Sequence, residues 1–254
     1  MNGLLLAIQF FTVLPIEKEL PLGRKEVTAM FIALPFVGAA IGAVMYAVSV
    51  LMIDVLGSGT LLTAVFIVLS GIVLTGGLHL DGWADTADAF FSYRDRDKRL
   101  EILEDPRLGA FGTMGLVLLI IVKIALFHEV LEQGLGHMVL FIALPFLARA
   151  GMNSYFSTIQ SAKNKGLAYF FKGKIRANHV ILLSIVSAGA VLIGLGYVVG
   201  NVMLPLLLFA VIAVGILLFR NWSLKHFGGV TGDLLGTFID GMEAVLWIVV
   251  LVSL

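Results

Sequence analysis

Three aspartates lie close together in the sequence at the spacing of a helix. Asp81, Asp85 and Asp88 occupy positions i, i+4 and i+7 in the segment GGLHLDGWADTAD, residues 76–88, so on a helix they would share one face. Like charges at this spacing repel one another, and charges at the end of a membrane segment also lose hydration. A divalent cation would offset both costs, and Mg²⁺ prefers carboxylate oxygens together with substrate phosphates. The spacing predicts a Mg²⁺ site, with a solvated acidic turn as the plainer alternative.

A second polar segment, EDPRLGAFG, covers residues 104–112. Asp105 could complete the metal shell. The planar guanidinium of Arg107 is suited to a phosphate group. The alternative is that the segment only ends one helix and begins the next around Pro106.

A glycine-rich segment, GGVTGD, covers residues 228–233 and precedes the last apolar stretch. Free backbone N–H groups at the start of a helix suit a phosphate, so Gly229, Thr231 and Asp233 are candidate phosphate contacts. A plain connection between two helices explains the same segment equally well.

Two polar residues fall inside an apolar stretch. Arg149 and Asn153 are one helical turn apart, and an arginine inside a membrane segment is a functional-site candidate. Pairing of Arg149 with Asp240 or Glu243 is the structural alternative. His79, two residues before Asp81, could act as a base or as a partner of the metal ligands.

The elements that must position these residues are membrane helices. Of the 254 residues 59% are hydrophobic and 13% are charged, about half the charged fraction of a soluble domain. No polar stretch is long enough for a separate soluble domain, which predicts one integral membrane domain over residues 1–254. The absence of cysteine excludes disulfides, thiolate metal sites and cysteine nucleophiles.

A helix needs about 20 apolar residues to cross a bilayer. The predicted fold is therefore an all-α, polytopic bundle of six to seven spans. The predicted spans cover residues 28–53, 61–78, 109–127, 138–156, 180–199, 202–219 and 234–254. Residues 2–14 are too few to span and predict an interfacial or re-entrant helix, and residues 94–104 predict a short amphipathic helix.

The basic residues are confined to alternate loops. Fifteen of the 17 Lys and Arg residues fall in residues 17–27, 80–108, 161–179 and 220–233. The positive-inside rule makes this face cytoplasmic, which predicts a multi-pass protein of the plasma (inner) membrane with its active site toward the cytoplasm. Acids contribute little to orientation, so the aspartates on this face need another explanation.

Three segments resemble one enzyme family. Residues 76–88, the pattern EDxRxGAFG at 104–112 and the pattern GGxTGDxLG at 228–236 resemble the signatures of the cobalamin synthase, or adenosylcobinamide-GDP ribazoletransferase, family. The segments FFTxLP at 10–15 and PxxAR at 145–149 are also similar. Trp83 and Ala89 depart from the residues usual there, leucine and glycine, without removing a chemical group.

The resemblance implies an integral membrane enzyme that needs Mg²⁺. It would join adenosylcobinamide-GDP to α-ribazole, or to its 5′-phosphate, and release GMP in the last step of nucleotide-loop assembly. A ribazole hydroxyl would attack the phosphorus nearest the cobinamide, a reaction that depends on positioning and charge neutralisation.

This reaction suggests a role for each candidate residue. Asp81, Asp85, Asp88 and Asp105 would hold Mg²⁺. Arg107 and Arg149 would stabilise charge on phosphate, and Asp88 or His79 would take the hydroxyl proton. Asp233 and the glycine-rich segment would hold a nucleotide.

Other classes stay open. The three aspartates could form the site of an ion or metal transporter, although such sites lie near the midplane in paired repeats and the second half of the chain does not repeat the aspartate segment. Another enzyme similar to the CDP-alcohol phosphotransferases, or a scaffold subunit, is a further alternative. The expected partners are small-molecule substrates and the bilayer, without nucleic acid. The small residues Gly38 and Gly42 are compatible with helix contacts, including those of a homo-oligomer.

Overall fold

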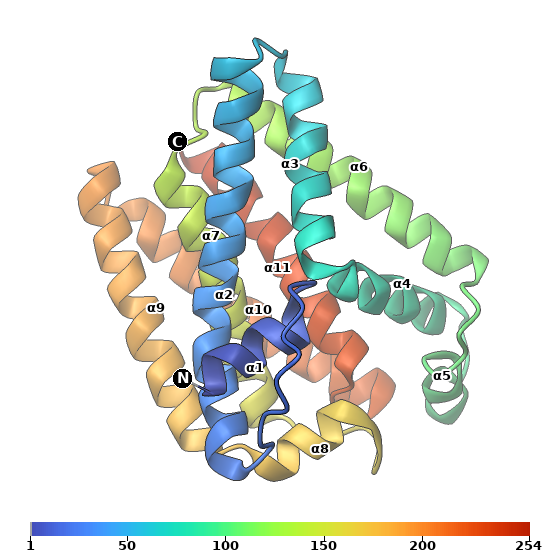
Figure 1. Cartoon of the computed structure of the whole chain (residues 1–254). Helices are drawn as coiled ribbons and strands as arrows, with labels where there is room; N and C mark the ends of the chain where they lie inside the picture. Colours follow the sequence, from blue (N-terminus) through green and yellow to red (C-terminus); the bar gives the residue numbers. More distant parts are fainter. Residues whose placement is uncertain (1) are drawn as a thin grey trace.

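The computed structural model describes residues 2–254 as a bundle of helices (Figure 1). Within these residues there is no strand, and the only β-type pairing is one isolated bridge between Ser161 and Val230. The predicted all-α class is therefore confirmed. The helices are α1 (Asn2–Phe11), α2 (Arg24–Val50) with a π-helical end η1 (Leu51–Val55), α3 (Thr60–Thr75), α4 (Leu78–Phe91), α5 (Arg96–Ile102), α6 (Ala110–Glu132), α7 (Met138–Thr158), α8 (Gly166–Lys174), α9 (Ala177–Val199), α10 (Met203–Phe227) and α11 (Gly232–Ser253).

Among residues 2–254, six helices are long and apolar enough to cross a membrane: α2 with η1, α6, α7, α9, α10 and α11. The pair α3 and α4 would make a seventh span if counted as one. This agrees with the predicted six to seven spans. Helix α1 has 10 residues, too few to cross a bilayer.

The structure corrects the second predicted span, residues 61–78. Helix α3 ends at Thr75, and α4 leaves it at an angle of 93°. Gly76 and Gly77 have φ values of +63° and +73°, a left-handed conformation that glycine adopts readily and that ends a helix. The break places the three aspartates on a helix that turns away from α3 (Figure 1).

Helix α7 forms the centre of the bundle and is buried along most of its length. Helix α2 approaches it closely at two glycines. A Cβ atom at Gly38 would lie 2.6 Å from the carbonyl oxygen of Pro145, and one at Gly42 would collide with the backbone of Phe141. Gly38 and Gly42 therefore serve packing between helices of one chain, as small residues do in membrane bundles.

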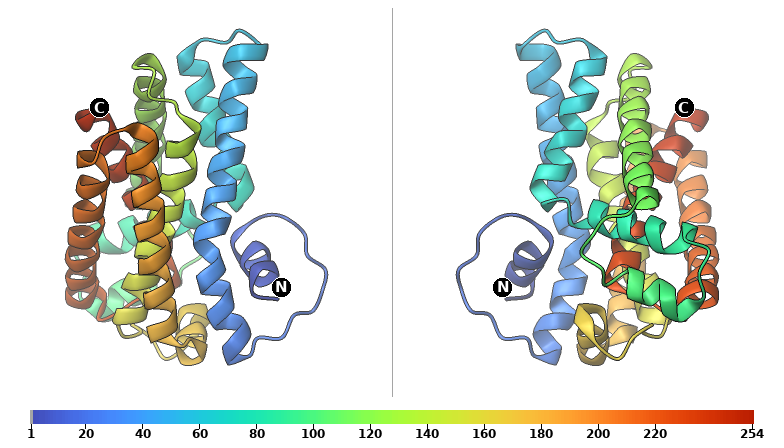
Figure 2. Two further views of the ribbon diagram at one scale, coloured as in Figure 1. Left: turned by 90° about the vertical axis from the view of Figure 1, so that its left-hand side faces the viewer. Right: turned by 90° about the vertical axis from the view of Figure 1, so that its right-hand side faces the viewer.

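The connections divide between two ends of the bundle. Those joining α2 to α3, α6 to α7 and α9 to α10 lie at the upper end, whereas α5, α8 and the turn between α10 and α11 lie at the lower end (Figures 1 and 2). The lower end carries the basic loops. Residues 161–179, expected to be a loop, contain the additional helix α8, and the predicted helix at 94–104 is the shorter α5.

Candidate active site

Helices α4 and α11 pack tightly where the acidic residues lie. Gly82 faces the backbone of Asp233, so that a Cβ at this glycine would lie 2.7 Å from the Asp233 carbonyl oxygen. The Thr237 hydroxyl donates a hydrogen bond of 2.9 Å to the Gly82 carbonyl oxygen and lies 2.8 Å from the Thr86 hydroxyl. At this contact there is no room for a larger side chain than glycine. The contact fixes the position of α4 relative to the start of α11.

The contact brings three carboxylates into one region. Asp81 on α4 is exposed, and Asp85 and Asp233 are half-buried. Asp85 lies within range of the charges of Asp81, Asp233 and Asp88. In residues 2–254 no three acidic or histidine side chains converge tightly enough to enclose an ion. The donor atoms are all carboxylate oxygens, the ligand type that suits Mg²⁺.

Asp81 and Asp233 open onto a cleft of about 440 Å³, whereas Asp85, one turn further along α4, is not part of its lining. Its polar wall includes His79, Asp81 and Asp233, together with Thr231. Lys163 and Lys165, from the segment between α7 and α8, also line it. The cleft therefore combines negative groups that could hold a cation with positive groups that could meet phosphate.

Glu104 holds the two lysines. Its carboxylate lies 3.0 Å from Lys163 Nζ and 2.9 Å from Lys165 Nζ. These hydrogen bonds, from Lys165 and then Lys163, lower the pKa of Glu104. In the sequence, both lysines indicate membrane orientation and are not singled out as site residues. A clue was available, because two lysines spaced two residues apart lie in the same set of loops as the aspartates.

The Asp88 side chain contacts the start of helix α6. Its carboxylate accepts hydrogen bonds from the backbone N–H groups of Gly109, at 3.0 Å, and Gly112, at 3.2 Å. These groups lie at the start of α6, whose N-cap residue Gly109 has no side chain to accept such bonds. Asp88 thus caps α6 from a neighbouring helix, and both of its oxygens are engaged.

Asp105 and Arg107 bind each other outside the cleft lining. Two guanidinium nitrogens of Arg107 donate to the Asp105 carboxylate at 2.9 and 2.7 Å. These bonds lower the pKa of Asp105 to about 2. The Arg107 side chain is 86% exposed, so the structure places this pair on the surface.

The glycine-rich segment fixes the start of α11. Gly228 has a φ of +76° and ends α10. Gly229 passes so close to residues 160–162 that a Cβ would lie 2.6 Å from the backbone nitrogen of Ala162. The Thr231 hydroxyl accepts a hydrogen bond of 3.3 Å from the N–H of Leu234 and so caps α11. Thr231 and Asp233 line the cleft, whereas Gly229 is buried behind it.

Arg149 and Asn153 lie inside the bundle and do not line the cleft. Arg149 Nη1 donates to Glu243, at 2.6 Å, and to the carbonyl oxygen of Pro145, at 3.0 Å. Asn153 donates to the carbonyl oxygen of Phe31 at 2.7 Å. The structural alternative, pairing with Glu243, is thus the arrangement found for Arg149.

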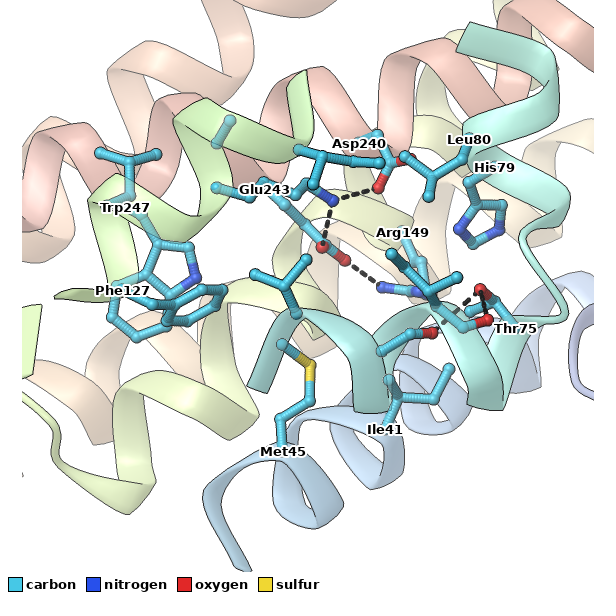
Figure 3. A pocket seen from close by; sticks show the side chains of 17 residues that line it. Ile41, Met45, Thr75, His79, Leu80, Phe127, Arg149, Asp240, Glu243 and Trp247 are labelled. Atoms are coloured by element: carbon cyan, nitrogen blue, oxygen red, sulfur yellow. Dashed lines mark hydrogen bonds and ion pairs between the residues drawn. The ribbon is translucent and has the colours of Figure 1, made fainter. Parts of the chain in front are cut away.

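A small inner cavity of about 50 Å³ contains this ion pair (Figure 3). Lys123 and Asp240 line the same cavity and are paired with each other. His79 lines both this cavity and the cleft, and its Nε2 atom is buried without a hydrogen-bond partner in residues 2–254. Figure 3 shows the His79 ring at the edge of the inner cavity, near Arg149.

Comparison with known proteins identifies the family. The model of the cobalamin-5-phosphate synthase family matches residues 3–251. The chain belongs to this family. Proteins named adenosylcobinamide-GDP ribazoletransferase are similar along most of their length. That of Geobacillus thermodenitrificans is 37% identical over 98% of this chain and 95% of its own. That of Acinetobacter baumannii is 34% identical over 100% of this chain and 98% of its own. No solved structure shows significant similarity.

The three segments that resemble the cobalamin synthase family meet in the structure, although residues 89–227 lie between the first and the third along the chain. The first contributes His79 and Asp81 to the cleft, the second contributes Glu104, and the third contributes Thr231 and Asp233. In this cobalamin-5-phosphate synthase family member, the cleft is therefore the candidate active site.

Proposed function

We propose that the cleft is the active site of an Mg²⁺-dependent adenosylcobinamide-GDP ribazoletransferase. The proposal depends above all on one observation. Carboxylates and lysines suited to a metal-bound diphosphate line a single cleft, in a chain whose relatives bear that enzyme name. An ion transporter would form its site from paired repeats, whereas the second half of this chain does not repeat the aspartate segment.

The reaction is a phosphoryl transfer. A hydroxyl of α-ribazole, or of its 5′-phosphate, attacks the phosphorus nearest the cobinamide. A new O–P bond forms, and the bond from that phosphorus to the bridging oxygen breaks. The second phosphate of the diphosphate leaves as part of GMP. The hydroxyl proton passes to solvent or to a phosphate oxygen. Such a reaction depends mainly on positioning and on stabilising charge spread over the phosphoryl oxygens.

Charge stabilisation would come from two sets of residues. Asp81, Asp85 and Asp233 are the carboxylates that would hold Mg²⁺, and when bound the ion would neutralise charge on the diphosphate. Lys163 and Lys165 would bind phosphate oxygens directly, and the substrate would replace Glu104 as their partner. Asp88 and Asp105 were also predicted as ligands, but their oxygens have other partners in this structure.

The predicted proton acceptors receive positioning roles in this proposal. Both oxygens of Asp88 bind the start of α6, and His79 Nε2 is buried. His79 would instead fix the position of the cleft lining relative to the ion pairs of the inner cavity, because its side chain lines both spaces. Arg149 would act through that same network rather than on phosphate.

The size of the cleft limits what enters it. A volume of about 440 Å³ lies within the range of about 300–1,000 Å³ for small-molecule sites. The diphosphate and the ribazole would be enclosed, and the much larger corrin ring would stay at the mouth. The basic residues at this end support a cytoplasmic location for the mouth, in the plasma membrane.

GMP release tests the proposal directly. Purified protein would be supplied with adenosylcobinamide-GDP, α-ribazole and Mg²⁺. We expect GMP formation, its loss on Mg²⁺ removal, and its loss in Asp81→Asn and Asp85→Asn. Full activity in either variant would disprove the metal assignment. Absence of product with the unaltered protein would disprove the enzyme itself, and cation flux into proteoliposomes would then favour the transporter.

A further inference from the structure

We infer that the aromatic wall of the cleft is the subsite for the benzimidazole base of ribazole. This inference depends on the proposed function, because it assigns one part of the cleft to one of the two substrates.

Three separate helices build the wall. Helix α1 contributes Phe10 and Phe11, α2 contributes Phe31, and α8 contributes Phe171. The ring centroids of Phe10 and Phe171 are 5.4 Å apart, those of Phe31 and Phe171 are 5.8 Å apart, and those of Phe11 and Phe31 are 6.5 Å apart, all in edge-to-face arrangements. The four rings form one cluster, which offers flat apolar surface to a ligand.

Solvent exposure shows which rings are available. Phe31 and Phe171 are buried in the core, whereas Phe10 and Phe11 are partly exposed. Met152 and Ala168 extend the same surface. A planar aromatic ligand could therefore contact Phe10 and Phe11 directly, while Phe31 and Phe171 hold these two rings in place.

The chemistry of the wall distinguishes the two bases in the reaction. Benzimidazole in ribazole has an apolar edge without amino or carbonyl substituents. Guanine carries a carbonyl, a ring N–H and an amino group, each of which needs a hydrogen-bond partner when buried. The side chains of this wall are Phe, Met and Ala and offer no such partner. The wall therefore suits benzimidazole and disfavours guanine.

The chain also links this wall to the phosphate-binding groups. Lys165 is the N-cap residue of α8, and Phe171 lies six residues later on the same nine-residue helix. A base against Phe10, whose ring packs on Phe171, would thus lie beside the short element that begins at Lys165. This arrangement would place the ribose hydroxyl of the acceptor near the diphosphate of the donor, as in-line attack requires.

Separate KM values for the two substrates test the inference in the full-length protein. Phe10→Leu and Phe11→Leu should each raise the KM for α-ribazole by about tenfold, since base stacking on an aromatic side chain is worth roughly that factor. The KM for adenosylcobinamide-GDP should not change. Phe170→Leu is the matched control, because Phe170 neighbours Phe171 but is absent from the cleft lining and should leave both values unchanged.

Direct binding separates this inference from the proposed function. Equilibrium dialysis of α-ribazole alone should show binding to the unaltered protein and weaker binding to Phe11→Leu, while Phe11→Tyr, which retains the ring, should bind normally. A variant that raises only the KM for the GDP-containing donor, or equal α-ribazole binding by Phe11→Leu and the unaltered protein, would overturn the subsite. Absence of GMP release by an unaltered protein that still binds α-ribazole through Phe11 would overturn the enzyme assignment instead.

Discussion

Arg149 and Glu243 form an ion pair inside the bundle, with Nη1 and Oε1 2.6 Å apart and the Arg149 side chain only 2% exposed. Lys123 pairs with Asp240, and its Nζ lies 3.9 Å from Glu243. The four groups carry two charges of each sign and join α6, α7 and α11. Charges in a membrane are tolerated where they pair within the protein interior, so this neutral network is expected to depend on every member.

Glu243→Gln should destabilise the protein by about 3–5 kcal/mol, because it leaves the buried Arg149 without a counter-charge. Thermal or denaturant unfolding in detergent measures this loss. The double variant Arg149→Met with Glu243→Leu removes both charges and should be closer in stability to the unaltered protein.

The exposed pair of Lys98 and Glu101, at 2.5 Å, provides the control for that measurement. Glu101→Gln should change stability by less than about 1 kcal/mol. Equal losses in Glu243→Gln and Glu101→Gln would contradict the role assigned to the buried network.

Asp88→Ala should destabilise the protein by about 0.5–2 kcal/mol, the usual cost of losing a helix cap, because the N–H groups of Gly109 and Gly112 lose their acceptor. Asp88→Asn keeps one oxygen and should retain most of the stability. Unfolding with and without Mg²⁺ separates a cap from a metal ligand. An Asp88→Asn protein of normal stability that no longer gains stability from Mg²⁺ would show that Asp88 is a ligand after all.

Gly82→Ala tests the contact that places the acids together. The new methyl group would meet the backbone of Asp233 at 2.7 Å, so α4 must move away from α11, at a cost of about 1–3 kcal/mol. GMP formation should fall further than stability alone explains, because Asp81 and Asp85 move relative to Asp233. Gly189→Ala in α9, where the added Cβ meets no atom within 4 Å, should leave activity intact. Normal activity in Gly82→Ala would show that this spacing is unimportant.

The membrane spans could be predicted because the bilayer sets the length of every apolar helix. The break had a local sign in Gly76 and Gly77, since paired glycines mark turns, but the angle of 93° could not be predicted from an apolar run that continues to Leu78. Helix α8 was missed because the charges of residues 161–179 already explained that segment as a loop.

The acidic segment could be singled out as a candidate site, but the partners of its residues could not be predicted. Asp88 is bound by groups 21 and 24 residues away, and such pairings depend on how α4 and α6 pack. Lys163 and Lys165 were overlooked for a different reason. Membrane orientation accounted for their charge, so nothing in the sequence required them to have a second role.

Lys163→Gln should raise the KM for adenosylcobinamide-GDP by about tenfold or more, because a hydrogen bond to a charged group is worth roughly 1.5–3 kcal/mol. Glu104→Gln should act in the opposite direction and lower that KM, since it releases both lysines for the substrate. Steady-state GMP formation measures both effects. The exposed Lys98→Gln is the control for loss of positive charge. A Glu104→Gln variant that weakens donor binding would show that Glu104 holds the lysines in their working position rather than competing with phosphate.

The membrane orientation can be tested with single cysteines, because the chain has none of its own. Gln133→Cys lies in the connection between α6 and α7, at the end that lacks Lys and Arg, and Lys98→Cys lies on α5 at the basic end. In intact cells a membrane-impermeant maleimide should label the first and not the second, since basic loops stay in the cytoplasm. Both should react after the membrane is permeabilised, which controls for burial. Labelling of Lys98→Cys alone in intact cells would place the cleft on the outer face, away from any cytoplasmic supply of the GDP-linked substrate.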